Sequence, residues 1–226
     1  MVRDVFHSKI DSIETMVLQM GEVIHNLLSQ LIVVFQQRQM GEEKLAEIIA
    51  GDASLDQLEY DIERTAMELL ALMQPMAIDL RSILCMIKMS MDLERIGDHI
   101  RKISRKIKKQ LAYGHYEHYV SLAEMTILLR QMVDQILVAF KEKNLILVKD
   151  TLKQDSRINE LQRELFKLYI EDMKNNPDEE IISSGVYLLF MTRFLERIGD
   201  HVENIGERVS YMITGDISAI RTPDYT

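Results

Sequence analysis

The chain has 226 residues, of which 47% are hydrophobic and 28% charged, with only 3 Pro and 9 Gly. This composition excludes disorder over most of the chain and supplies ample material for an apolar core. The formal net charge of -9 argues against nucleic acid as a partner and favours cations or basic surfaces.

Apolar residues recur at helical spacing along almost the whole chain, so we expect it to be all-α. Proline forces the residue before it out of the helical region, so Pro75 and Pro177 should end helices. Further turns are expected at Gly41 and Lys143, and Tyr113 to His115 should end the first half. The six helices expected are, in chain order, residues 5–38, 42–74, 77–111, 119–141, 145–174 and 179–213.

Three long antiparallel helices form the first half of this plan, and the second half repeats it. Each helix carries one apolar stripe, which two neighbours suffice to cover. The sequence therefore predicts two pseudo-repeated antiparallel three-helix bundles, one spanning residues 1–114 and the other residues 115–226.

The repeat is most explicit in one heptapeptide. Leu-Glu-Arg-Ile-Gly-Asp-His occupies residues 93–99 and returns, letter for letter, at residues 195–201. A fixed period of this kind indicates two copies of one structural unit. In each copy a Glu and an Asp stand four residues apart, which places both carboxylates on one face of a helix.

Each acid pair should meet a second polar pair on the preceding helix. In an antiparallel hairpin, facing residues have numbers with a constant sum, about 150 around Pro75 and about 355 around Pro177. This relation predicts that two sets of four side chains lie close together. The candidate metal ligands are Asp52, Asp56, Glu94 and Asp98 in the first half, and Asp155, Asn159, Glu196 and Asp200 in the second.

A count of 100° per residue places these acids opposite the apolar stripe of their own helix. We therefore expect both quartets to line outer grooves, open to water and without a penalty for buried charge. His99 and His201 lie nearer the core stripe, where they could act as ligands or pack behind the ligands.

Oxygen ligands favour hard cations such as Mg²⁺, Ca²⁺, Mn²⁺ or iron, and make Zn²⁺ less suitable. The alternative is an ordinary solvated acidic face, with Asp52 capping a helix. A di-iron oxidase would require two inward-facing Glu-x-x-His motifs, whereas the chain offers only Glu22 to His25. Phosphate loops and nucleophilic triads are also missing, so we predict no enzyme.

The N-terminus lacks the apolar region of a signal peptide, and the strongest apolar run, residues 31–35, is too short to span a bilayer. These features predict a cytoplasmic protein that meets membranes only through partners. The single cysteine, Cys85, lies among apolar neighbours and is expected to be a core thiol.

The chain resembles the PhoU family of bacterial phosphate-transport accessory regulators over nearly its whole length. The resemblance rests on the duplicated Glu-Arg-Ile-Gly-Asp-His, on residues 75–81 (Pro-Met-Ala-Ile-Asp-Leu-Arg), and on the pair Asp52 and Asp56. It implies two pseudo-symmetric three-helix bundles whose E(D)-x-x-x-D motifs hold multinuclear metal clusters in some members. Asn159 departs from that acidic pattern, which places full occupancy of the second site in question.

The resemblance also implies a function. PhoU-like proteins are negative regulators of the phosphate-starvation response, commonly homodimers, that act between a phosphate ABC transporter, through its ATPase subunit, and a sensor histidine kinase. The alternatives are a metal-dependent enzyme or metal store that uses the carboxylate clusters, and a helical scaffold without metal. A store or enzyme should act alone, whereas an adaptor should do nothing without its partners.

Overall fold

The protein is described by a computed structural model that covers residues 2–37, 42–51, 53–110, 118–216 and 218–219. Every regular element within these ranges is a helix, which confirms the all-α prediction. The helices are α1 (Val2–Gln37), α2 (Glu42–Gly51), α3 (Ala53–Met73), α4 (Ala77–Gln110), α5 (Tyr119–Glu142), α6 (Leu145–Leu152), α7 (Asp155–Asn175) and α8 (Glu179–Thr214).

Three of the four predicted turns lie where they were expected. Pro75 separates α3 from α4, and Pro177 separates α7 from α8. Lys143 takes a left-handed φ of 53° after α5, and the side chain of Asn144 then accepts a hydrogen bond from the Leu147 backbone N–H at 3.1 Å. The turn at Gly41 and the expected end of the first half at residues 113–115 lie outside the described residues.

One of the six predicted helices is interrupted within the described residues. The helix expected over residues 145–174 stops at Leu152 and restarts at Asp155, whereas the one expected over residues 42–74 is described as α2 and α3 on either side of residue 52. Gln135 on α5 stabilises the break after Leu152, because its side-chain oxygen accepts from Gln154 Nε2 at 2.6 Å and from Thr151 Oγ1 at 3.3 Å. Apolar periodicity does not register such side-chain hydrogen bonds, which explains why this break was missed.

A serine hydrogen bond next to this break recurs in the first half. Ser156 Oγ donates to the Lys153 carbonyl, and Ser54 Oγ donates to the Gly51 carbonyl, both at 2.8 Å. These pairs stand 102 residues apart, like the repeated heptapeptide. The serine contact therefore belongs to the repeated unit, and in the second half it lies where α7 begins at Asp155.

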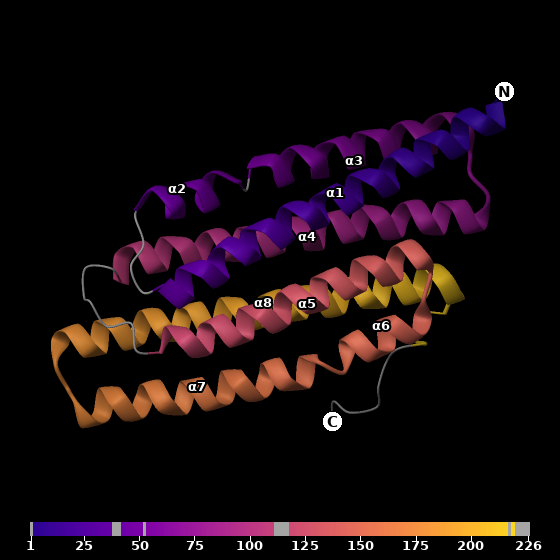
Figure 1. The fold of residues 1–226 in the computed structure, drawn as a ribbon. Helices are drawn as coiled ribbons and strands as arrows, with labels where there is room; N and C mark the ends of the chain where they lie inside the picture. Colours follow the sequence, from indigo (N-terminus) through magenta and orange to yellow (C-terminus); the bar gives the residue numbers. More distant parts are fainter. Residues whose placement is uncertain (1, 38–41, 52, 111–117, 217, 220–226) are drawn as a thin grey trace.

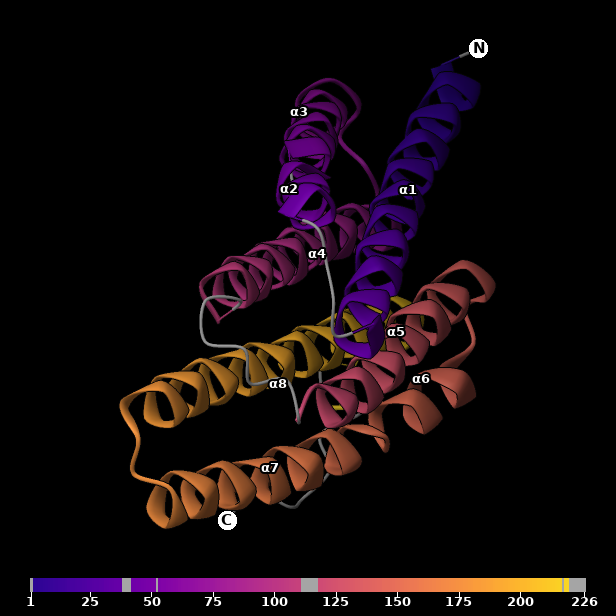
Figure 2. The same cartoon turned by 60° about the vertical axis from the view of Figure 1, so that its left-hand side comes forward.

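The two halves lie side by side, as Figures 1 and 2 show. In the first half α1, α3 and α4 pack against one another and α2 covers α4, whereas in the second α6 and α7 cover α5 and α8. The α4–α8 and α1–α5 contacts join the halves. Because α4 and α8 have neighbours on several sides, little of their surface between the halves faces solvent.

Polar pairs related by the repeat line the α1–α5 contact. His25 Nδ1 lies 2.8 Å from an Asp134 oxygen, and Arg130 donates to Ser29 Oγ at 2.9 Å. His25 and Arg130 stand 105 residues apart, as do Ser29 and Asp134. The pseudo-twofold relation between the halves therefore extends to their polar contacts.

Helix α1 is the most apolar of the long helices by the measure used for membrane spans. Within the described residues, Phe6–Gln37 is the one helix long and apolar enough to cross a membrane, with a mean hydropathy of 1.4 over a stretch of 18 residues. Half of that stretch is buried, and Ile13, Met20 and Leu31 on this helix are fully buried, where it contacts α3, α4 and α5. Its apolar character is thus explained by its position in the core.

The repeated heptapeptide supplies core residues in both halves. Leu93 and Ile96 on α4, and Leu195 and Ile198 on α8, are fully buried. Cys85 is also buried, as predicted, and burial raises the pKa of its thiol, which keeps it protonated. The apolar residues of the heptapeptide thus pack in the core. This packing orients its acids and its histidine toward the candidate sites.

Candidate functional site

The carboxylates of the second half assemble at one groove between α7 and α8. The groove has a volume of about 660 Å³, and all four residues expected from the arithmetic around Pro177 lie in its wall. Its described lining is Asp155, Ser156, Asn159, Glu160, Gln162, Arg163, Glu196, Asp200 and Glu203. The predicted convergence of two helices at this point is thus present in the structure, and we call it the second acidic groove.

The expected orientation of the acids was wrong in one respect. Only 7% of Asp155 and 9% of Glu196 is exposed, and in the first half only 8% of Asp98. The helical-wheel count treated each helix as having one covered face, whereas α4 and α8 each contact several neighbours. Burial of these charges therefore carries an energetic penalty that the sequence did not indicate.

The electrostatics of the second acidic groove reflect this burial. Burial raises the pKa of Glu196, and the charges of Asp200 and Asp155 raise it further against the opposing effect of Arg193 and Arg197. Burial and the charge of Asp200 likewise raise the pKa of Asp155. The carboxyl groups of the groove are thus harder to ionise than usual. A bound cation would lower their pKa values and favour the ionised form.

Arginines compensate part of the charge. Arg193 donates to Glu196 Oε1 at 2.5 Å, and Arg197 donates to Asp200 Oδ2 at 2.9 Å. The second oxygen of Glu196, Oε2, is buried and receives no hydrogen bond from the described residues, although Arg197 Nε lies 3.9 Å from it. An acceptor in that condition is costly unless another group, such as a cation, satisfies it.

Asn159 and Gly199 position Asp155. The Asn159 amide donates to Asp155 Oδ2 at 2.7 Å, so the residue that departs from the acidic pattern orients a neighbouring carboxylate. A Cβ on Gly199 would lie 2.9 Å from Asp155 Oδ1. The glycine of the repeated heptapeptide therefore leaves the space that Asp155 occupies.

Gly199→Ala should move Asp155 without unfolding the protein. The clash involves the end of a side chain that can rotate, and alanine favours a helix over glycine by about 1 kcal/mol. We expect a thermal midpoint within a few degrees of the wild type, together with weaker cation binding by titration calorimetry. Unchanged cation affinity would show that the place of Asp155 in the groove does not matter.

The first half forms a related site with a different charge balance. Burial raises the pKa of Glu94, and the charges of Asp98, Glu59 and Asp56 raise it further, which places Asp56 near Glu94 as predicted. Asp98 is compensated by Arg101 and by Lys102 at 3.2 Å, and although burial opposes this, its pKa lies below the usual value. The predicted neighbour of Asp98, Asp52, lies outside the described residues.

Two acidic residues of these sites were missed from the sequence. Glu203 lines the second acidic groove, and burial, with the charges of Asp155, Glu207 and Asp200, raises its pKa. Glu59 acts on Glu94 in the first half. Helical spacing could have identified both, because Glu203 lies seven residues after Glu196 and Glu59 three after Asp56.

The second acidic groove is the stronger candidate for a cation. Glu203 occupies the position that Arg101 holds in the first half, 102 residues earlier. An acid thus stands where the first half places a cation that neutralises Asp98. Glu203 thus adds a carboxylate to the groove in which Asn159 departs from the acidic pattern.

The donor set of the second acidic groove fits a hard cation, because all its groups are oxygens and Glu196 Oε2 is unsatisfied. As placed, no three His, Cys, Asp or Glu side chains of the described residues converge closely enough for one ion. Binding would therefore require these carboxylates to approach one another, which their mutual repulsion opposes until a cation neutralises it.

The two histidines of the heptapeptide meet between α4 and α8. The rings of His99 and His201 lie 5.5 Å apart, and His99 also stacks on Phe194 at 5.7 Å. Burial lowers the pKa of His99 to about 4, with further lowering by Lys102 and His201. Both rings therefore join the halves of the molecule, and His99 is neutral at pH 7.

The repeat is broken at these histidines. His201 Nδ1 lies 2.9 Å from an Asp92 oxygen, whereas the position equivalent to Asp92, 102 residues later, is Phe194. His99 Nδ1 consequently has no hydrogen-bond partner among the described residues. One histidine is held by a carboxylate and the other by ring stacking.

Fold and site together define a class: helical proteins built from two copies of one three-helix unit, each presenting carboxylates from a Glu-x-x-x-Asp pair. The model of the PhoU domain matches residues 17–107 and again residues 122–209. The chain therefore belongs to the PhoU family.

Relatives match over most of their lengths. A phosphate-specific transport system accessory protein PhoU homolog of Clostridium acetobutylicum is 30% identical over 95% of this chain and 97% of its own length. The accessory protein PhoU of Serratia marcescens is 30% identical over 93% of this chain and 85% of its own. The crystal structure of PhoU from Pseudomonas aeruginosa has a TM-score of 0.87 at 26% identity, covering 93% of this chain and all of that one.

A second solved structure carries a regulatory name. It is the phosphate transport system regulatory protein PhoU from Streptococcus pneumoniae, with a TM-score of 0.84 at 29% identity, covering 94% of this chain and 98% of that one. The names of these relatives describe accessory or regulatory proteins of phosphate transport.

Proposed function

We propose that this protein regulates phosphate uptake and represses the phosphate-starvation response. The observation that carries the proposal is family membership over both halves of the chain, with relatives named as accessory proteins of the phosphate-specific transport system. A protein of this kind acts on transport by binding the proteins that carry it out.

The partners that fit this role are the ATPase subunit of a phosphate ABC transporter and a sensor histidine kinase. Support comes from the pseudo-repeated architecture, because each half offers a related face and one chain can therefore engage two partners. The adaptor works in the cytoplasm, where both partners expose domains. A homodimer would double these faces, and light scattering on the purified protein measures that state.

The second acidic groove adds a cation to the proposal. Asp155, Glu196 and Asp200 would hold it, with Glu203 and the side-chain oxygen of Asn159 as further donors. When bound, a hard cation supplies positive charge that neutralises these carboxylates. The chain's own residues position the site: Asn159 orients Asp155, and the arginines limit the repulsion until a cation arrives.

Deletion of the gene in its host tests the regulatory role. We expect alkaline phosphatase, or another output of phosphate starvation, to rise in phosphate-rich medium, and the wild-type gene to restore repression. A Glu196→Gln/Asp200→Asn protein should restore it poorly if the cation matters. Normal repression in the deletion strain would refute the regulatory role, whereas full rescue by the variant would refute only the role of the groove.

A pull-down separates an adaptor from a metal store or enzyme. The tagged protein should retain the transporter ATPase subunit from a host lysate, and salt and divalent ions should alter that binding because the groove is charged. Metal turnover by the purified protein alone, with no retained subunit, would favour the alternative.

A further inference from the structure

The C-terminal half of α4 is strongly basic in a chain whose net charge is -9. Six of the nine residues from 101 to 109 are Lys or Arg. Five of them, together with Phe194 of α8, line an open groove of about 650 Å³. We call these five the basic strip: Lys102, Arg105, Lys106, Lys108 and Lys109. Whole-chain composition conceals this local reversal of charge.

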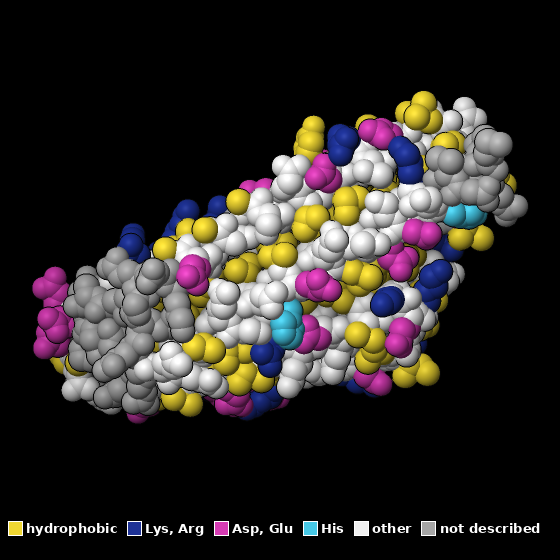
Figure 3. All heavy atoms as spheres, turned by 45° about the horizontal axis from the view of Figure 1, so that its top comes forward, with side chains coloured by type: hydrophobic (Ala, Val, Ile, Leu, Met, Phe, Trp, Pro, Cys, Tyr) yellow, Lys and Arg dark blue, Asp and Glu magenta, His cyan; other side chains and the backbone are white. Residues whose placement is uncertain are grey.

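Much of this charge is available to a ligand. Lys102 is paired with Asp98, and the ammonium group of Lys106 lies 4.7 Å from the ring centre of Phe190. Arg105 and Lys109 are exposed, and neither forms an ion pair with another described residue. Lys and Arg side chains gather along the upper left edge of the face in Figure 3.

An apolar row lies beside the basic strip. Ile182, Val186 and Phe190 follow one another at four-residue spacing on α8 and are 40%, 40% and 46% exposed. The contact between Lys106 and Phe190 joins the row to the strip. Figure 2 shows this part of α8 running beside the C-terminal half of α4. Cations and exposed apolar side chains thus share one outer face.

The repeat shows that the basic strip is denser in cations than its equivalent in the second half. Leu80 and Leu84 on α4 stand 102 residues before Ile182 and Val186 and are exposed like them, whereas Lys88 stands 102 residues before Phe190. Two of the three positions of the apolar row therefore recur. Arg208 follows Lys106 by 102 residues and keeps its charge. The residues 102 positions after Lys102, Arg105, Lys108 and Lys109 are not cationic: Asn204, Glu207, Ser210 and Tyr211. The C-terminal end of α4 therefore combines more cations with a complete apolar row.

We infer that this face binds the surface of an anionic bilayer directly. Clustered Lys and Arg residues are attracted to anionic headgroups, with each cation contributing a gain of severalfold in partition. Exposed Ile, Val and Phe side chains enter the headgroup boundary, and lysine stems reach along it. Because charges beyond about 10 Å are screened at 0.1 M salt, acids elsewhere on the chain do not cancel the local attraction.

The apolar row beside the cations favours a bilayer over an acidic protein segment. Ile182, Val186 and Phe190 stand at four-residue spacing on one helix, next to the basic strip, so an anionic surface with an apolar interior can meet both kinds of side chain. This binding goes beyond the proposed function, in which partner proteins provide the link to the membrane, and it requires none of those partners. It would place the protein beside a membrane transporter in a fixed orientation.

Vesicle co-sedimentation of the purified full-length protein tests the inference. Vesicles of phosphatidylglycerol and phosphatidylcholine in equal parts should bind the protein at 50 mM NaCl, and pure phosphatidylcholine should not. A chelator is present throughout, so that no divalent ion bridges the acidic grooves to the lipid. Binding should weaken steeply as salt rises. Absence of binding to the anionic vesicles at low salt overturns the inference.

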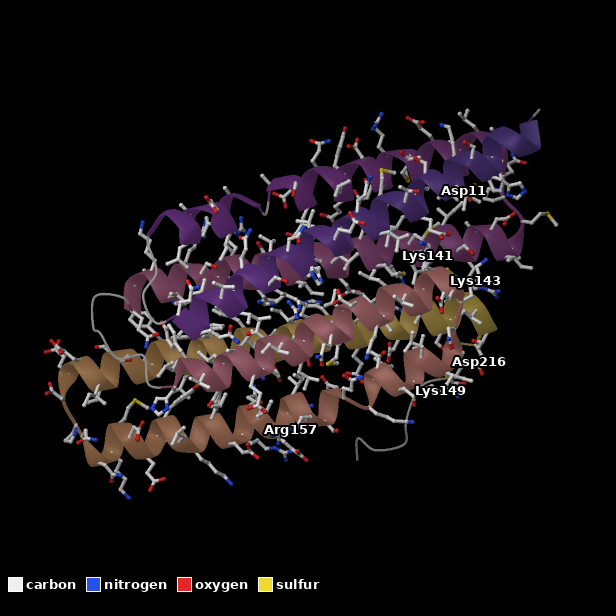
Figure 4. The ribbon with its side chains drawn as sticks, in the orientation of Figure 1. Asp11, Lys141, Lys143, Lys149, Arg157 and Asp216 are labelled. Carbon is white, nitrogen blue, oxygen red and sulfur yellow. The ribbon has the colours of Figure 1, made fainter. Side chains whose placement is uncertain are left out.

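The discriminating variant is Arg105→Glu/Lys109→Glu, which should lower partition roughly tenfold or more. Its matched control is Lys141→Glu/Lys149→Glu, with the same change in net charge. Figure 4 labels both control lysines at the end of the molecule where α5 and α6 meet, away from the C-terminal end of α4. The control should bind the vesicles like the wild type. An equal loss of vesicle binding in both variants would overturn the inference that the basic strip forms a specific binding face.

A third variant examines the apolar row. Phe190→Ser should reduce partition severalfold while circular dichroism shows unchanged helix content. Light scattering on each variant identifies competing explanations. If Arg105→Glu/Lys109→Glu alters the assembly state, the face binds a second copy. If polyglutamate binds the wild type and anionic vesicles do not, the face suits an acidic protein segment. Either result overturns the inference.

Discussion

His99→Phe should make the protein more resistant to acid. The pKa of His99 is about 4 in the folded protein and about 6.5 when unfolded. Below pH 6.5 the imidazole of His99 therefore binds a proton in the unfolded chain but not in the folded protein. The free energy of unfolding consequently falls as the pH drops from 6.5 toward 4. Phenylalanine does not titrate, so the variant escapes this loss.

At pH 5 the free energy of unfolding of the variant should exceed that of the wild type by about 1–2 kcal/mol after allowance for solvent screening. This difference corresponds to about 2–8 °C in thermal midpoint. Phenylalanine keeps the stacking on Phe194 and removes a buried nitrogen that has no hydrogen-bond partner among the described residues. The groups that face His99 are Lys102 and Asp98 on α4, and His201 and Arg197 on α8, and the variant leaves all four in place.

His201→Phe is the matched control, because it alters the equivalent residue of the other half. His201 is held by Asp92, and its loss leaves a partly buried carboxylate whose remaining hydrogen bond from the described part of the chain comes from the Asn204 amide, at 3.3 Å. We expect a destabilisation of about 1–3 kcal/mol at pH 7, opposite in sign to the effect of His99→Phe. Calorimetric scans from pH 4.5 to 7.5 measure both, and equal behaviour of the two variants would contradict the assigned environments.

Neutralising the second acidic groove should separate stability from cation binding. Because Asp155 and Glu196 have raised pKa values, the folded protein binds their protons more tightly than the unfolded chain does. In chelator, their contribution to stability therefore grows as the pH falls from neutral toward the usual carboxyl range. An Asp155→Asn/Glu196→Gln/Asp200→Asn protein should lack this pH dependence of stability. It should also be more stable than the wild type at pH 7.

Added Mn²⁺ or Mg²⁺ should make the wild type more stable than the triple variant. A cation at a hundred times its dissociation constant stabilises the folded protein by about 2.7 kcal/mol, or roughly 5–10 °C for a chain of this size. The wild type should gain this amount and the triple variant should not. Elemental analysis of both purified proteins, covering iron, calcium and zinc as well, identifies the resident ion.

A second triple variant controls for acidity alone. Asp11, Glu14 and Glu22 line another groove on α1, beside Lys141. Asp11→Asn/Glu14→Gln/Glu22→Gln removes the same charge and should keep the thermal response to cations. If the wild type gains no stability from any of these ions, or if both triple variants lose the response, the cation proposal is wrong.

The repeated heptapeptide and the proline turns were sufficient to predict the duplicated architecture and one of its grooves. The repetition of the heptapeptide at residues 93–99 and 195–201 predicted two related units, and the constant sum around Pro177 brought Asp155, Asn159, Glu196 and Asp200 to one groove, as the structure has them. These predictions succeeded because helical periodicity and antiparallel pairing are local rules that need no knowledge of other contacts.

The break between α6 and α7 and the burial of the acids were beyond those rules. That break depends on Gln135 of the preceding helix α5, which lies 16 residues before Thr151 and 19 before Gln154. Glu196 and Asp98 are buried because α4 and α8 pack against one another as well as against their own units. A helical wheel contains no information on such packing.

The sequence by itself determined the all-helical fold, the twofold repetition and which acids share a helix face, because each follows from spacing along one chain. Only the tertiary structure decided that the two halves meet through His99 and His201, that burial raises the pKa of Glu196, and that Lys106 lies against Phe190. Those features depend on how α4 lies against α8, and pairing between residues about a hundred positions apart is set by packing of complete surfaces rather than by any local pattern.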